Sequence, residues 1–173
     1  MFHLIQIVLL FAFPALVIVG AMRDAVSFTI PNWISIALGA AFFPAALVLG
    51  AEPGQIGVAC LIGMATLVAG MAMFAVGWIG GGDAKLFAAA GLWMGLGALL
   101  PYLLVTALAG GALAVMLLGL RSVWLRPLTA HGPGWISRLA TPGENVPYGI
   151  AIAFGALAAF PESLLMTLFR AVS

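Results

Sequence analysis

The sequence predicts an all-α polytopic membrane protein of about six transmembrane helices, and three observations lead to that prediction. Of its 173 residues, 65% are hydrophobic and only 6% are charged, a balance that no water-soluble domain of this size would keep in solution. The apolar residues form runs near the roughly 20 residues that a helix needs to cross about 30 Å of hydrocarbon. Polar or Gly/Pro-rich segments separate these runs. We therefore expect one transmembrane domain over residues 1–173.

The N-terminal part of the chain holds two apolar runs. The first covers residues 4–22 and stops at Arg23 and Asp24. No Lys or Arg precedes it, which is the reverse of a signal peptide's polarity, so we interpret it as a first transmembrane helix. A short polar segment, 23–32, leads into the second run, 33–50.

The middle of the chain predicts three helices, the last two formed from one long run. A helix over 55–79 ends in a glycine-rich segment, 80–85. Residues 84–120 carry Lys85 as their only charge, and as one helix they would be about 55 Å long, far more than a bilayer needs. We therefore expect this run to fold back on itself. The residues that mark the turn are Gly95, Gly97 and Pro101.

The C-terminal part begins with a polar loop, 121–147, that contains four of the ten prolines. A last apolar run, 148–169, is interrupted only by Pro161 and Glu162. This run predicts a sixth helix.

The basic residues orient the predicted helices. Six helices place the connecting segments alternately on two sides, so that segments 23–32, 80–85 and 121–147 share one side. The basic residues on that side are Arg23, Lys85, Arg121, Arg126 and Arg138, and only Arg170 falls on the other. The positive-inside rule makes the first side cytoplasmic, so both termini are expected to face outward.

Asp24 and Asp83 lie at this inner face, because Asp24 ends the first predicted helix and Asp83 begins the fourth. An ionisable residue beside hydrocarbon is expensive, and by default it is a candidate functional residue. Two carboxyl groups at one depth can share a proton, because like charges close together resist ionising together. One can then take a proton from water while the other polarises a carbonyl, as in an aspartic protease. We predict that chemistry for this pair.

The segment before Asp83 consists of Gly80, Gly81 and Gly82. Consecutive glycines allow another chain to come close to the backbone. A plainer interpretation makes Asp83 the N-cap of the following helix, with the glycines as a turn. Lys85 argues against it, because a cation in the first helical turn meets the positive end of the helix dipole and needs a partner. A snorkelling lysine at the membrane interface is an equally good interpretation of Lys85.

Three short motifs carry a resemblance to a known family. They are Asp24 followed by Ile30, Pro31 and Asn32; Gly80, Gly82 and Asp83; and Val146, Pro147, Tyr148 and Gly149. In order, spacing and helix count the chain resembles the prepilin peptidases, intramembrane aspartic proteases of the G-x-G-D class. The short form found in tight-adherence (Flp) pilus systems is the closest likeness, and the resemblance covers essentially the whole chain.

The resemblance implies a specific activity. Such enzymes remove the basic leader from prepilins or pseudopilins at the cytoplasmic face of the bacterial inner membrane, and they leave the apolar helix for pilus assembly. By that likeness Asp24 and Asp83 are the catalytic pair, and the partners are the prepilin substrate, the lipid bilayer and the pilus assembly machinery. The residues expected to bind substrate or shape the site are Gly80, Gly81, Gly82, Lys85, Ile30, Pro31, Asn32, Pro147, Tyr148 and Gly149.

The chain departs from the larger members of that family in its first inner segment. Those members have a cytoplasmic domain with paired cysteines there and also N-methylate the new terminus. Segment 23–32 has no cysteine, and the single Cys60 lies in an apolar run. We therefore expect no metal and no other cofactor, and methyltransferase activity is in doubt. No basic cluster suggests nucleic-acid binding.

Two rival functions stay open from the sequence. A small transporter or proton-relay subunit would use the same two carboxylates, but it predicts acidic groups spread across the membrane depth, whereas Asp24 and Asp83 share one face. Glu52 and Glu162 fall in outer turns and are expected to be solvated. A non-catalytic assembly scaffold is the second rival, and no feature argues for it.

Overall fold

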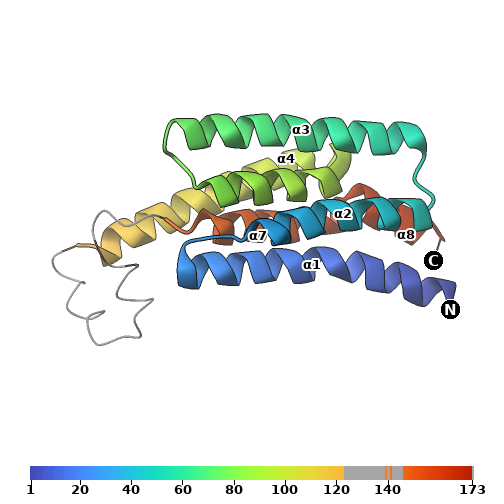
Figure 1. Ribbon diagram of the computed structural model, residues 1–173, viewed down its shortest axis with the longest axis horizontal. Coiled ribbons are helices and arrows are strands. Elements are labelled where there is room, and N and C mark those ends of the chain that lie inside the picture. The colour runs from blue at the N-terminus through green and yellow to red at the C-terminus, as the bar shows by residue number, and fades with distance from the viewer. Residues whose placement is uncertain (123–138, 140, 142–145, 173) are drawn as a thin grey trace.

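The computed structural model describes residues 1–122, 139, 141 and 146–172, and its elements are all helical. The predicted all-α fold is thereby confirmed for the described part of the chain. Figure 1 shows the helices packed side by side along one long axis. They are α1 (Phe2–Ser27), α2 (Asn32–Val48), α3 (Pro53–Ala75), α4 (Gly81–Leu120), α7 (Tyr148–Ala159), the 3-10 turn η1 (Phe160–Glu162) and α8 (Leu164–Val172). Most of the predicted loop 121–147, including Arg126 and Arg138, lies outside the described residues.

Four helical stretches are long and apolar enough to cross a membrane, namely His3–Ser27, Pro53–Ala75, Gly81–Leu120 and Tyr148–Ala171. Helix α2 is apolar but shorter, with 17 residues. Large apolar side chains cover the outside of the bundle, as lipid contact requires. The chain is therefore a polytopic membrane protein, while six spans and outward termini stay predictions.

Helix α4 consists of two helical segments that fold back on each other at Gly95. Gly95 has φ 65° and ψ −175°, a conformation that is accessible essentially to glycine alone. Phe87 and Tyr102 would lie about 22 Å apart in a straight helix. Instead their rings stack at 5.2 Å, and the Tyr102 hydroxyl donates to the Phe87 carbonyl oxygen at 3.0 Å. The predicted fold-back is confirmed, and Figure 1 shows the reversal.

Helix α1 is longer than the sequence predicts. It was expected to stop at Arg23 and Asp24 but continues to Ser27. The Ser27 hydroxyl donates to the Arg23 carbonyl oxygen at 2.7 Å, and Phe28 (φ 54°) caps the helix by donating its N–H to the Asp24 carbonyl oxygen at 2.8 Å. Asp24 therefore lies inside the last turns of α1, and the connection to α2 is only 28–31.

The turn between α3 and α4 also differs from the prediction. Helix α3 ends at Ala75, and Gly77 (φ 77°) turns the chain before the expected end of the run. Helix α4 begins at Gly81 with Gly80 as its N-cap, so Asp83 is not the N-cap but the third residue of the helix. Asp83 nevertheless satisfies an unpaired donor at the helix start, because its Oδ2 accepts the Gly80 N–H at 3.0 Å.

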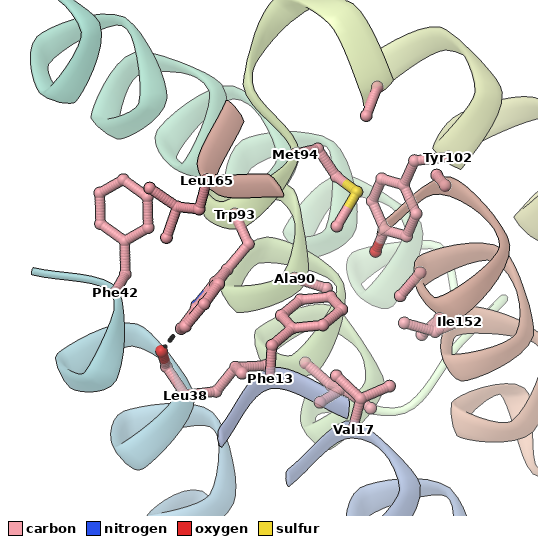
Figure 2. Packing of buried hydrophobic residues seen from close by; sticks show 14 of the residues in the cluster. Phe13, Val17, Leu38, Phe42, Ala90, Trp93, Met94, Tyr102, Ile152 and Leu165 are labelled. Carbon is pink, nitrogen blue, oxygen red and sulfur yellow. Dashed lines mark hydrogen bonds between the residues drawn. The ribbon is translucent and has the colours of Figure 1, made fainter. Parts of the chain in front are cut away.

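The buried core holds α1 and α2 against α4 around Trp93 (Figure 2). Trp93 is fully buried and donates its Nε1–H to the Leu38 carbonyl oxygen at 2.9 Å. The rings of Phe13 and Phe42 lie 5.2 and 5.9 Å from it. Lipid is as apolar as this core, so close packing and the indole hydrogen bond must supply the attraction between the helices. The core thereby fixes α1, which carries Asp24, against α4, which carries Asp83.

The two ends of the bundle carry different parts of the chain. Both termini lie at one end, while the end of α1, the start of α4 and the start of α7 meet at the other (Figure 1). The last apolar run was predicted as one sixth helix, but the structure divides it into α7 and α8 by η1, which contains Pro161 and Glu162. The end away from the termini is where the predicted motifs converge, and we call it the carboxylate end.

Candidate active site

Asp24 and Asp83 line one cavity of about 430 Å³ at the carboxylate end. Both side chains are buried, with exposed fractions of 3% and 5%, and the two carboxyl groups are near enough to interact electrostatically. The structure thus brings together two acids that come from different helices. We call this space the carboxylate cavity. Its other lining residues are Phe28, Phe74, Gly77, Trp78, Ile79, Gly80, Val146 and Tyr148.

A backbone donor from the start of α7 holds the Asp24 carboxyl group. The Gly149 N–H donates to Asp24 Oδ2 at 2.7 Å. Gly149 is in the first turn of α7, where N–H groups have no partner inside the helix and attract negative charge. This hydrogen bond holds the start of α7 against Asp24, beside the carboxylate cavity.

Gly149 must be glycine for this approach to occur. A Cβ at that position would lie 2.8 Å from Asp24 Oδ2 and 2.9 Å from Ile30 Cδ1, closer than real Cβ contacts. Gly82 has a similar constraint from the other side, since a Cβ there would lie 3.1 Å from both Ile30 Cβ and the Ile30 carbonyl oxygen. Ile30 thus packs between two glycines, and the connection that follows α1 is held beside both acids.

The Asp83 carboxyl group is held at one oxygen only. Its Oδ2 accepts the Gly80 N–H, whereas its buried Oδ1 makes no hydrogen bond within the described part of the chain. A buried acceptor without a donor is costly, and each such atom calls for an explanation. Asp83 Oδ1 is therefore available to accept a hydrogen bond in the carboxylate cavity.

Lys85 has the partner it was expected to need, but that partner is not an acid. Its Nζ donates to Asn32 Oδ1 at 2.8 Å, which ties the first turn of α4 to the start of α2. Both residues line a separate cavity of about 500 Å³, together with Cys60. A role of Lys85 in orienting the carboxyl pair stays a prediction.

The remaining predicted site residues lie around the same helix starts. Pro31 and Pro147 are the N-caps of α2 and α7, and Pro147 is fully buried. Tyr148 is half-buried and lines the carboxylate cavity. Gly81 makes only ordinary contact, since a Cβ there would lie 3.5 Å from the Phe74 ring.

Sequence reasoning missed three aromatic residues that line the carboxylate cavity, Phe28, Phe74 and Trp78. Phe28 has a positive φ, which is uncommon for a residue other than glycine and tends to occur at functional sites. Trp78 is 68% exposed. Its place just before the glycine segment is the one feature of the sequence that could have identified it as a site residue. Within the described residues no three His, Cys, Asp or Glu side chains cluster as metal ligands do, and the expected absence of a metal stays a prediction.

Comparison with known proteins decides the family. A family model described as the type IV leader peptidase family matches residues 11–115, which is more than half of the chain. The chain belongs to the type IV leader peptidase family. This family membership confirms the resemblance that the motifs indicated. The protein is therefore a membrane protease whose substrates are, in general, prepilins.

The matched region includes both Asp24 and Asp83. The match ends before α7, so the family comparison does not include Gly149. The hydrogen bond from Gly149 to Asp24 is known from the structure alone. Searches of curated proteins and of solved structures found no significant match.

Proposed function

We propose that this protein is an intramembrane aspartic endopeptidase in which Asp24 and Asp83 activate water to remove the leader of prepilins or pseudopilins. One observation carries the proposal: two buried carboxyl groups from α1 and α4 line one cavity and are near enough to interact with each other. Family membership supports the peptidase activity, and the paired acids support the aspartic type.

The proposed mechanism uses one ionised and one protonated carboxyl group. The ionised carboxylate takes a proton from water as the water oxygen attacks the scissile carbonyl carbon, and the other carboxyl gives its proton to the carbonyl oxygen. The tetrahedral intermediate then collapses and the C–N bond breaks. The carboxyl group that took the proton from water gives it to the leaving amine, and the other carboxylate takes back a proton from a hydroxyl of the intermediate, which restores the starting pair. Backbone N–H groups of Gly149 and Gly80 hold Asp24 and Asp83, so the acids are oriented before substrate binds.

The mouth of the carboxylate cavity suits an extended peptide. Gly77 and Gly80 line the cavity and are exposed, and neither carries a side chain that would keep a backbone away. Phe74 and Trp78, with exposed fractions of 46% and 68%, flank the same opening. We expect the peptide around the scissile bond to lie along these glycines.

The proposed cytoplasmic location rests on charge. Arg23 lies near the end of α1, Lys85 at the start of α4, and Arg121 caps the end of α4, all at the carboxylate end. Arg170 lies in α8, near the C-terminus and the opposite end. By the positive-inside rule this distribution supports six spans, outward termini and a site at the cytoplasmic face of the bacterial inner membrane, where the pilus assembly machinery would receive the product.

The position of the other acids favours a peptidase over a transporter or proton relay. Glu52 precedes α3 and Glu162 lies in η1, both at the end that carries the termini. Both are exposed. Among the described residues, no Asp or Glu lies between these glutamates and the Asp24–Asp83 pair along the bundle, as a relay through the membrane would require.

The proposal is tested by co-expressing the protein with pilin precursors from the same genome. We expect a shortened pilin whose new N-terminus lies just before its apolar helix, measured by gel mobility and N-terminal sequencing. Cells that lack the protein provide the control and should keep the precursor intact. Intact precursors in both strains, together with protonophore-sensitive transport that depends on the protein, would favour the relay instead.

A further inference from the structure

A chain of cavities leads from the carboxylate cavity along the membrane part of the bundle. Ile79 and Tyr148 line both the carboxylate cavity and a neighbouring cavity of about 210 Å³. That cavity in turn shares Met73 and other residues with a larger one of about 680 Å³. We call these two spaces together the apolar groove. On its two long sides lie 58–73 of α3 and 96–114 of the second segment of α4.

The lining of the apolar groove predicts an apolar occupant. Apart from Thr66, Thr106 and Tyr148, its lining side chains are aliphatic, Met or Phe, or the position is glycine. Thr66 donates its hydroxyl to the Ile62 carbonyl oxygen of its own helix at 2.8 Å and offers nothing to a ligand. The groove carries no charge among its lining residues. Thr106 adds one buried hydroxyl that makes no hydrogen bond among the described residues, so the groove suits an occupant that is apolar along most of its length.

The apolar groove is as long as one membrane-spanning helix, whereas lipid would need one acyl chain from each leaflet to fill it. On α4 the lining residues run from 96 to 114, which in a helix is about 27 Å. The hydrocarbon core of a bilayer is about 30 Å thick. One acyl chain extends through a single leaflet and so fills about half of that thickness, whereas an apolar helix of roughly 20 residues extends through all of it.

We propose that the apolar groove binds the apolar helix of the substrate, with the helix starting at the carboxylate cavity and running toward the end that carries the termini. This inference rests on the proposed function, because a leader that is joined directly to an apolar helix places that helix next to the scissile bond. The two residues shared with the carboxylate cavity, Ile79 and Tyr148, mark where the helix begins. The seating of the helix then decides which peptide bond reaches Asp24 and Asp83.

The other large cavity does not offer the same path. The cavity beside Lys85 and Asn32 shares no lining residue with the carboxylate cavity. A helix bound there would not lead continuously to the acids.

Gly111 provides a direct test. It lines the apolar groove, and a Cβ added to it would have no atom within 4 Å, so the side chain of Gly111→Leu begins in open space and extends into the groove. Leucine is also a better helix former than glycine. Gly39→Leu is the matched control, because Gly39 lies within α2, has the same open space and lines none of these cavities. Ala107→Phe, at the junction of the two cavities, is the second groove variant.

The first measurement is cleavage of a full pilin precursor by purified protein in lipid vesicles. We expect Gly111→Leu and Ala107→Phe to raise KM about tenfold with kcat within about twofold, because they obstruct binding remote from the reacting atoms. Gly39→Leu should match wild type. Groove variants that match wild type, or that lower kcat with KM unchanged, would overturn the groove assignment and leave the peptidase assignment standing.

The second measurement detects the contact itself. In an Asp83→Asn, Cys60→Ala background, cysteines are placed one at a time along the precursor helix and an added oxidant is supplied. Gly111→Cys should then form a disulfide only with the one or two precursor positions at its own depth, because a disulfide needs Cα atoms within about 7 Å, while Gly39→Cys should form none. No disulfide from Gly111→Cys, or equal yields from both positions, would overturn the groove assignment. Wild-type protein that cleaves no precursor would instead overturn the proposed function, and the groove assignment with it.

Discussion

Asp83→Asn is expected to slow leader cleavage by roughly 10²- to 10⁴-fold, and Asp24→Asn by a similar factor, since each replacement removes one partner of the acid–base pair. Asparagine keeps the size of the side chain and an oxygen that accepts the Gly149 or Gly80 N–H, so the local contacts can persist. The free energy of unfolding should not fall either, because Asp24 and Asp83 are buried together and repel each other when both are ionised. Each variant removes that repulsion. Cleavage of a pilin precursor in lipid vesicles measures the first effect, and thermal unfolding in detergent measures the second.

Glu162→Gln is the matched control for these variants. Glu162 is an exposed acid at the opposite end of the bundle, so its replacement should leave cleavage within about twofold of wild type, as expected for a surface change away from the site. Cleavage at the wild-type rate by either aspartate variant would contradict the assignment of that residue. A loss in the aspartate variants accompanied by lower thermal stability would point to a structural role instead.

Gly149→Ala is expected to lower kcat about 10²-fold, although alanine adds one carbon atom and no charge. That carbon would lie 2.8 Å from Asp24 Oδ2, so either the carboxyl group or the start of α7 must move. A displacement of about 1 Å of a catalytic group can cost about 10²-fold in rate. Crowding of this kind also costs roughly 1–3 kcal/mol of stability.

The control for Gly149→Ala is Gly39→Ala. Gly39 also lies in a helix, but an added Cβ there meets no atom within 4 Å. We expect it to cleave like wild type and to unfold at the same or a higher temperature, because alanine favours the helix. Wild-type cleavage by Gly149→Ala would show that the close approach of α7 to Asp24 is not needed for activity.

The fold was largely predictable because membrane thickness limits helix length. The run 84–120 is too long for one crossing, and this alone required the reversal that the structure has at Gly95. Helix ends were less predictable. Helix α1 passes Arg23 and Asp24 because the Ser27 hydroxyl and the Phe28 N–H satisfy their carbonyl oxygens in its last turn, so apolarity alone misplaced its end.

The two acids of the candidate site could be predicted, but not the contacts that hold them. Counting apolar runs was enough to place Asp24 and Asp83 at one face. The hydrogen bond from Gly149 to Asp24 joins residues 125 positions apart and depends on how α7 approaches α1, which no local pattern records. Phe28 gave no signal either, since its positive φ arises from the cap of a helix that was expected to end earlier.

The cleavage rate of the double variant Asp24→Asn/Asp83→Asn, measured beside both single variants under single-turnover conditions, tests the central claim most directly. If the two acids act as one catalytic unit, losing one already disables the pair, and the double variant will cleave no more slowly than the slower single variant. Losses that multiply would contradict this account, because they would mean that Asp24 and Asp83 act independently of each other.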